Sequence, residues 1–175
     1  SGFDLTTGIP QFNTLTSHGV SFEAKLWKGI FSTEMAYYHS GQDSDGDDFA
    51  IANSSFRYII GQNFDLKKEW NVAFQYYGEL IVNYNTQKDT WPEGFPIPPR
   101  LRDMITLRIG KKLMNQRVQL SLFNYLGIAE RDNYLRFNVS YKLKDDWKID
   151  LGGNIFSGRD DFSFWNQFQY NTNLY

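Results

Sequence analysis

The sequence predicts an all-β protein, an antiparallel up-and-down transmembrane β-barrel, on the basis of three observations. Apolar and polar residues alternate in about eight segments, as where Val139, Tyr141 and Leu143 alternate with Ser140 and Lys142. A repeat of two residues places successive side chains on opposite faces of a strand. The polar positions carry long charged side chains, and short connections alternate with long ones. These features together are typical of outer-membrane barrels.

The expected strands follow one another as plain hairpins. In the first, Val20 and Phe22 occupy one face, and Glu23 and Lys25 occupy the other. In chain order the strands are expected at residues 19–27, 30–39, 54–64, 69–80, 104–113, 118–126, 134–143 and 147–156.

The remaining strands are predicted by the same alternation. The apolar positions of the second to fourth strands are Phe31 and Met35, then Phe56, Tyr58 and Ile60, then Trp70, Val72 and Phe74. The apolar positions of the fifth, sixth and eighth strands are Ile105, Leu107 and Ile109, then Val118, Leu120 and Leu122, then Ile149 and Leu151. Each set leaves polar or charged residues on the opposite face.

The connections are expected to alternate in length. Short turns are expected at residues 28–29, 65–68, 114–117 and 144–146, and longer loops at 1–17, 40–53, 83–103 and 157–172, with a modest one at 127–133. Outer-membrane barrels have short periplasmic turns and long outer loops. Aromatic residues near the expected strand ends, such as Trp27, Trp70 and Trp147, suit the level of the lipid headgroups. A soluble barrel or sandwich, with the apolar face inside, is the alternative fold.

The composition is consistent with a barrel wall. The chain has 175 residues, an aromatic content of 18% and a mean hydropathy of -0.51. A strand that faces lipid on one side only keeps the average polar. No run approaches the roughly 18 apolar residues of a membrane helix. The absence of cysteine excludes a disulfide framework and thiolate metal sites. The net charge of -2 and the lack of a basic block argue against a nucleic-acid partner.

Residues 1–175 are expected to form a single β-barrel domain that is only part of a larger barrel. If the short turns are periplasmic, the first strand runs inward and the last one outward. The chain would then start and finish on the extracellular side, whereas complete bacterial barrels have an even number of strands and both termini in the periplasm. We therefore expect earlier strands and a final strand to be missing, with Asn173, Leu174 and Tyr175 beginning that final strand.

A family resemblance points in the same direction. Segment 147–158, followed by Asp160, Asp161, Phe164 and later aromatic and asparagine residues, resembles the C-terminal end of a porin-like outer-membrane family of proteobacteria and sulfate-reducing bacteria. Tyr37-Tyr38-His39-Ser40 with Gly46-Asp47-Asp48, and Phe74-Gln75-Tyr76-Tyr77, strengthen the resemblance. It implies the fold and a location in the bacterial outer membrane rather than a chemistry, because none of these segments is a catalytic motif.

The candidate functional residues are charged side chains on the expected lumen face. They are Glu23, Lys25, Glu34, Arg57, Glu79, Arg108, Lys112, Arg136, Lys142, Lys148 and Asp150. Charges are tolerated in a barrel only beside water or a counter-charge. They therefore indicate either ion pairs between neighbouring strands or a wet pore whose selectivity they set. Basic residues outnumber acidic ones here, which favours anionic solutes.

Loop 83–103 is the second candidate. Trp91, Phe95 and Ile97, together with several prolines, make it stiff and apolar. Such a loop can narrow the lumen, close the mouth as a lid, grip a hydrophobic ligand, or simply be held down by its own aromatic residues.

Metal binding and catalysis have weaker signals. Asp43, Asp45 and Asp47 resemble the start of a calcium loop, but Asp48 and Ser54 stand where an EF-hand needs glycine and glutamate. The simpler interpretation is a solvated acidic loop without a metal. His18 and His39 are the only histidines, and no third partner for a Ser-His-Asp triad is specified. We therefore expect that the protein is not an enzyme and that it binds no cofactor.

The leading functional hypothesis is a porin-like channel for passive diffusion of small polar or anionic solutes. The alternatives are a transporter of hydrophobic molecules and a non-transporting scaffold or interaction protein. The expected partners are outer-membrane lipid, lipopolysaccharide and small solutes, and a homo-oligomer is compatible with each hypothesis.

Overall fold

The computed structural model describes residues 2–3, 10–11, 14–144 and 146–175. Apart from a two-residue ladder between β1 (Gly2–Phe3) and β2 (Pro10–Gln11), its strands form one antiparallel sheet. The long strands are β3 (Leu15–Leu26), β4 (Gly29–Ser40), β5 (Ser55–Leu66), β6 (Trp70–Ile81), β7 (Leu101–Leu113), β8 (Val118–Gly127), β9 (Asp132–Lys144) and β10 (Trp147–Gly158). The short elements are helix α1 (Tyr84–Thr90), the 3-10 helix η1 (Asn166–Asn171) and strand β11 (Asn173–Leu174).

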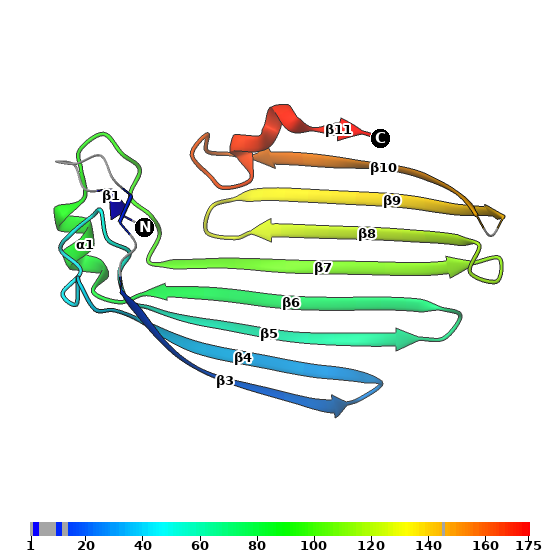
Figure 1. The fold of residues 1–175 in the computed structure, drawn as a ribbon, viewed down its shortest axis with the longest axis horizontal. Coiled ribbons are helices and arrows are strands. Elements are labelled where there is room, and N and C mark those ends of the chain that lie inside the picture. The colour runs from blue at the N-terminus through cyan, green and yellow to red at the C-terminus, as the bar shows by residue number, and fades with distance from the viewer. Residues whose placement is uncertain (1, 4–9, 12–13, 145) are drawn as a thin grey trace.

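The nine strands of the sheet lie in chain order, from β3 at one edge to β11 at the other. Each long strand pairs with the next one as a hairpin (Figure 1). The all-β antiparallel fold and the predicted strands are therefore confirmed. No pairing joins β3 to β11 among the described residues, so the sheet is open there and its closure into a barrel stays a prediction.

The connections alternate in length as predicted, except that the connection at 128–131 is no longer than the turn at 114–117. The turns at 27–28, 67–69 and 114–117 lie at one end of the sheet, and the longer connections and α1 lie at the other (Figure 1). These three turns use left-handed backbone at non-glycine residues; in the turn between β5 and β6, φ is 59° at Lys68 and 60° at Glu69. That conformation suits the twist of a tight hairpin. Of the turn predicted at 144–146, residue 145 lies outside the described residues.

Several predicted boundaries were wrong. Strand β3 starts at Leu15, inside the predicted loop 1–17, and most of that loop lies outside the described residues. The predicted loop 83–103 contains α1 and ends where β7 begins at Leu101. Alternation alone missed these strand ends because pairing with a neighbour, such as Leu15 with Ser40, extends a strand beyond its apolar residues.

The strand register separates two faces. Partners across a ladder share a face, so the pairs Val20–Met35, Tyr58–Gly78 and Leu122–Phe137 define an apolar face. The pairs Ser21–Glu34 and Arg57–Glu79 define a polar face. Both faces run from β3 to β10, because the ladders keep their register except for a shift between Trp147 and Lys148 at the turn end of β10.

The described part of the chain has no hydrophobic core. None of its hydrophobic side chains is buried, and Phe22 and Leu151 on the apolar face are 57% and 62% exposed. Exposed apolar area of this extent is rare on soluble monomers. A single sheet has nothing to cover this face, so its environment has to supply the cover.

One glycine on the apolar face makes room for an aromatic ring. A Cβ at Gly78 would meet Cε1 of Tyr58 at 2.7 Å, because the Tyr58 ring lies over the glycine and packs against Tyr76 at 5.8 Å. We expect Gly78→Val to destabilise the sheet by about 1–3 kcal/mol through overpacking. A denaturant titration in lipid vesicles would measure the loss.

The matched control is Gly110→Val on the adjacent strand. A Cβ there meets only Asn71 atoms, at 3.8 Å, which is ordinary contact. Equal losses from the two variants would show that the close contact between Gly78 and Tyr58 is not the cause.

Candidate functional site

All of the predicted lumen residues lie on the polar face of the sheet. The ladders place Glu34 opposite Ser21, Arg57 opposite Glu79, and Lys142 opposite Lys148. The same alternation places the others there: Glu23, Lys25, Arg108, Lys112, Arg136 and Asp150. The structure therefore brings these charges onto one surface, whichever solvent that surface meets.

Two ion pairs satisfy part of this charge. Arg57 Nη2 lies 2.8 Å from Glu79 Oε1 across the β5–β6 ladder, and Lys148 Nζ lies 3.0 Å from Asp150 Oδ1 along β10. The Arg57 guanidinium also lies over the Tyr38 ring, 4.3 Å from its centre. Such partly exposed pairs contribute about 0.2–1 kcal/mol each. The Arg57–Glu79 pair is of the predicted kind, between neighbouring strands, whereas the Lys148–Asp150 pair lies within one strand.

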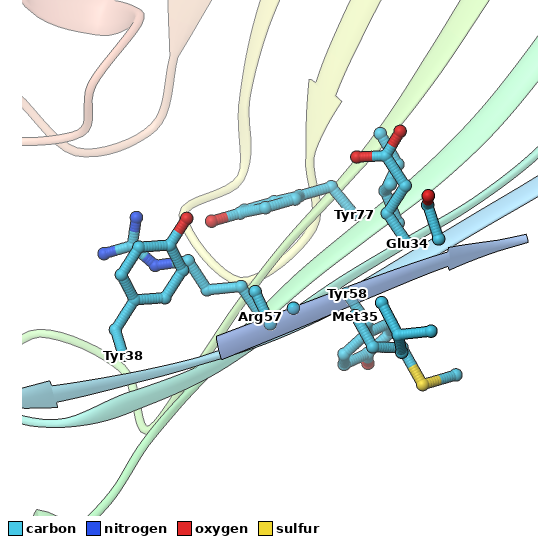
Figure 2. A pocket seen from close by; sticks show the side chains of 11 residues that line it. Glu34, Met35, Tyr38, Arg57, Tyr58 and Tyr77 are labelled. Carbon is cyan, nitrogen blue, oxygen red and sulfur yellow. The ribbon is translucent and has the colours of Figure 1, made fainter. Parts of the chain in front are cut away.

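A hollow of about 460 Å³ surrounds the Arg57 pair. Figure 2 shows Glu34, Tyr38, Arg57 and Tyr77 on one side of the strands, whereas Met35 points to the other side. The Tyr77 hydroxyl donates to Glu79 Oε2 at 3.4 Å, which holds both side chains beside the guanidinium. The lining is mixed, because Val20, Met35 and Ile59 also contribute to it, and its polar groups offer hydrogen bonds to a hydrated solute.

Some cations of the polar face have no acidic partner among the described residues. Lys25, Arg108 and Lys112 form no ion pair with a described residue. Arg108 and Arg136 lie on β7 and β9, each opposite Phe123 of the intervening strand β8. Two strand spacings separate their Cα atoms by roughly 10 Å. This row of the sheet presents two guanidinium groups and is positively charged.

An aromatic cluster at the loop end of the polar face was not predicted. It comprises Phe123, Tyr125, Tyr134, Phe156 and Trp165. Tyr134 stacks on Phe156 at 4.6 Å and on Tyr125 at 5.8 Å, and Trp165 packs against Tyr134 at 4.9 Å. The signal was present in the sequence, because Phe123 and Tyr125 continue the parity of the polar positions Gln119 and Ser121.

The segment 159–172, which contains η1, folds back over this cluster. The backbone N–H of Trp165 donates to Asp132 Oδ2 at 2.7 Å, and that of Phe164 donates to Glu130 Oε2 at 3.1 Å. Glu130 also pairs with Arg102 at 2.8 Å. The carboxylates of Glu130, in the turn before β9, and of Asp132, the first residue of β9, therefore anchor the segment to the loop end of the polar face. The chain then returns to pair β11 with β10, as predicted for residues 173–175.

The apolar loop residues lie elsewhere. Trp91 is half-buried, Phe95 and Ile97 are exposed, and their segment lies beyond the ends of the strands (Figure 1). Trp91 and Ile97 share a hollow of about 400 Å³ with Phe162 of the folded-back segment. The segment therefore lies at the loop end of the sheet and not over the middle of its polar face.

In the acidic loop at 40–53, the carboxylate of Asp43 bonds to the backbone of the loop itself. Asp43 is 5% exposed and accepts the backbone N–H groups of Gly46, Asp47 and Asp48 at 2.9–3.3 Å. These hydrogen bonds explain why Asp43 is buried, since its side chain stabilises the turn of the loop backbone. In the described part of the chain, no group of three or more His, Asp or Glu residues is arranged to hold a metal ion.

The two histidines both lie on the apolar side of the β3–β4 hairpin. His39 Nδ1 lies 3.5 Å from the Ser54 hydroxyl, and its ring stacks on Tyr37 at 6.4 Å. His18 pairs with Tyr37 in the ladder, and His39 pairs with Thr16. Ser40, which follows His39 in the sequence, belongs to the opposite face and so does not adjoin its ring to form a Ser-His pair.

Comparison of the chain with protein-family models, with curated proteins and with solved structures finds no match in any of the three. In the part of the chain that the structure describes, no helix is both long and apolar enough to cross a membrane. The two faces of the sheet are therefore the features that bear on function.

Proposed function

We propose that this chain forms part of the wall of an outer-membrane β-barrel channel. Small polar or anionic solutes would cross this channel by passive diffusion. One observation carries the proposal: a single sheet exposes a continuous apolar face on one side and gathers most of the charged strand residues on the other, with Asp103 and Lys111 of β7 as exceptions. Lipid hydrocarbon can cover the apolar face without matching its shape, because lipid chains are fluid. Water on the polar face solvates the charged side chains.

The strand lengths support this setting. Most long strands have 12 or 13 residues. At about 3.3 Å per residue such a strand is about 40 Å long, and a tilt of about 40° lets it cross a hydrocarbon core of about 30 Å. Outer-membrane lipid and lipopolysaccharide are the partners that this proposal implies, and the bacterial outer membrane is the location.

Closure of the sheet is a necessary part of the proposal. Unpaired strand edges are too costly in hydrocarbon, because each free backbone group loses its hydrogen bond. The outer edges of β3 and β11 need partner strands, which either the same polypeptide or further copies in a homo-oligomer would supply. A closed wall would turn the polar face into a lumen.

The direct test is conductance. The purified protein is added to a planar lipid bilayer under a salt gradient, and we expect stepwise current increases with a preference for chloride over potassium. A protein that inserts, as shown by protease protection, but passes no current would overturn the channel and favour a scaffold.

A charge reversal at Arg108 tests which face lines the path. Arg108 is exposed on the polar face and forms no ion pair with a described residue. We expect Arg108→Glu to lower the chloride-to-potassium permeability ratio by about two- to five-fold, since a nearby unit charge acts with about 1 kcal/mol in water. The reversal potential under the salt gradient measures this ratio.

The control is Lys67→Glu, the same reversal on an exposed residue of the turn between β5 and β6. It should leave the permeability ratio within error of the original protein. A larger shift from Lys67→Glu than from Arg108→Glu would place the ion path away from the polar face.

The aromatic cluster favours a second candidate function, transport of hydrophobic molecules. Tyr125, Tyr134, Phe156 and Trp165 form an apolar surface on the face that is otherwise polar. Lipid or hydrocarbon that copurifies with the protein, and is lost on Phe156→Ser, would favour this function over a water-filled channel.

A further inference from the structure

We propose that the hollow beneath the folded-back segment 159–172 binds a small organic cation, an ammonium or guanidinium group attached to a flat or short apolar body. The hollow has a volume of about 250 Å³ and is lined by Tyr77, Glu79, Arg102, Met104, Asp132 and Trp165, among others. The inference depends on the fold of this end of the sheet and goes beyond the proposed channel.

The charge of the hollow is negative after its ion pairs are counted. Glu79 is paired with Arg57, and Glu130 is paired with Arg102, each at 2.8 Å. Asp132 is only 2% exposed and forms no ion pair with a described residue. A buried carboxylate is costly without a counter-charge. A cationic ligand would supply that counter-charge.

The carboxylate of Asp132 is held in place before any ligand arrives. Its Oδ2 accepts the backbone N–H of Trp165 at 2.7 Å. Its Oδ1 lies where a Cβ of the facing residue Gly127 would be, so the glycine is what allows the carboxylate to fit against β8. A group fixed in this way loses little conformational freedom on binding, which favours affinity.

The walls of the hollow suit the apolar part of such a ligand. Trp165 and Phe164 meet edge to face at 4.7 Å, and both line the hollow with Tyr77 and Met104. Aromatic rings attract a cation through their negative faces, and Trp is the strongest of them. Carboxylate and aromatic rings together distinguish an organic cation from both an inorganic cation and a neutral aromatic molecule.

The test is calorimetric titration of the full chain in detergent micelles with three probes of similar shape. Benzylammonium should bind at least tenfold more tightly than benzyl alcohol, and benzoate should not bind. Equal affinity for benzylammonium and benzyl alcohol would overturn the proposal in favour of a merely apolar hollow. This comparison needs no variant and does not depend on conductance, so its failure is distinct from failure of the channel.

The variant Asp132→Asn tests whether binding requires the negative charge of Asp132 and not only its hydrogen bond to Trp165. The asparagine oxygen can still accept the Trp165 N–H, but the negative charge is gone. We expect a loss of tenfold or more in benzylammonium affinity, with the tryptophan fluorescence spectrum of the protein unchanged. Glu93→Gln, an exposed loop carboxylate outside the hollow, is the control and should bind like the original protein.

Met104→Lys provides a second variant in case the asparagine disturbs the segment. Met104 lines the hollow, so a lysine there brings an internal ammonium group toward Asp132 and should abolish binding of benzylammonium. Unchanged affinity in either variant, with unchanged fluorescence, would refute the cation site.

Discussion

Replacing Trp165 with alanine is expected to release segment 159–172 from the polar face of the sheet. The indole packs against Tyr125, Tyr134, Phe156 and Phe164, with ring centres 4.7–6.3 Å apart. Truncation of a well-packed Trp to alanine lowers the free energy of unfolding by about 3–5 kcal/mol. For this half-buried ring we expect a loss of about 2–4 kcal/mol. Amide hydrogen exchange should therefore accelerate in 159–172 and stay slow in β4 to β8.

Phe162→Ala is the matched control, because Phe162 belongs to the same segment but is 74% exposed and makes no ring contact with a described residue. It should leave exchange in the segment nearly unchanged. Equal acceleration by both variants would mean that the aromatic cluster does not anchor the segment. Under the channel proposal, Trp165→Ala should also raise the single-channel conductance, since the segment narrows the polar side.

An arginine at Leu122, in the middle of the apolar face, is expected to destabilise the membrane-embedded protein by about 2–4 kcal/mol. Leu122 pairs with Ile109 on β7 and with Phe137 on β9, so its side chain is surrounded by apolar neighbours. A guanidinium there would face hydrocarbon without water or a counter-charge. A urea titration of the protein folded in lipid vesicles would measure the change.

The adjacent residue provides the control. Ser121 pairs with Gly110 and Asn138 on the polar face, where an arginine meets polar neighbours. Ser121→Arg should therefore cost less than about 1 kcal/mol, as most surface substitutions do. Similar destabilisation by both variants would mean that lipid does not cover the face that carries Leu122.

The strands and their two faces were predictable from local pattern. A side-chain period of two is a property of the extended backbone, so the parity that assigned Val20 and Glu23 to opposite faces persisted across each hairpin. The predicted candidate residues, from Glu23 to Asp150, consequently lie on one face.

The site at the loop end was only partly predictable. The parity of β8 places Phe123 and Tyr125 on the polar face, but alternation cannot say what covers them. Their partner Trp165 is 40 positions beyond Tyr125 in the sequence and belongs to a segment without a repeat. The hydrogen bonds from this segment to Glu130 and Asp132 are likewise long-range contacts that no local pattern encodes.

The sequence by itself determined that this protein is an antiparallel hairpin sheet with one apolar and one charged face, because alternation and turn spacing are local consequences of backbone geometry. Only the tertiary structure decided that segment 159–172 returns over the polar face and encloses Asp132. That arrangement depends on ring packing and carboxylate contacts between distant segments, whose energies exist only once the sheet has brought β8, β9 and β10 side by side.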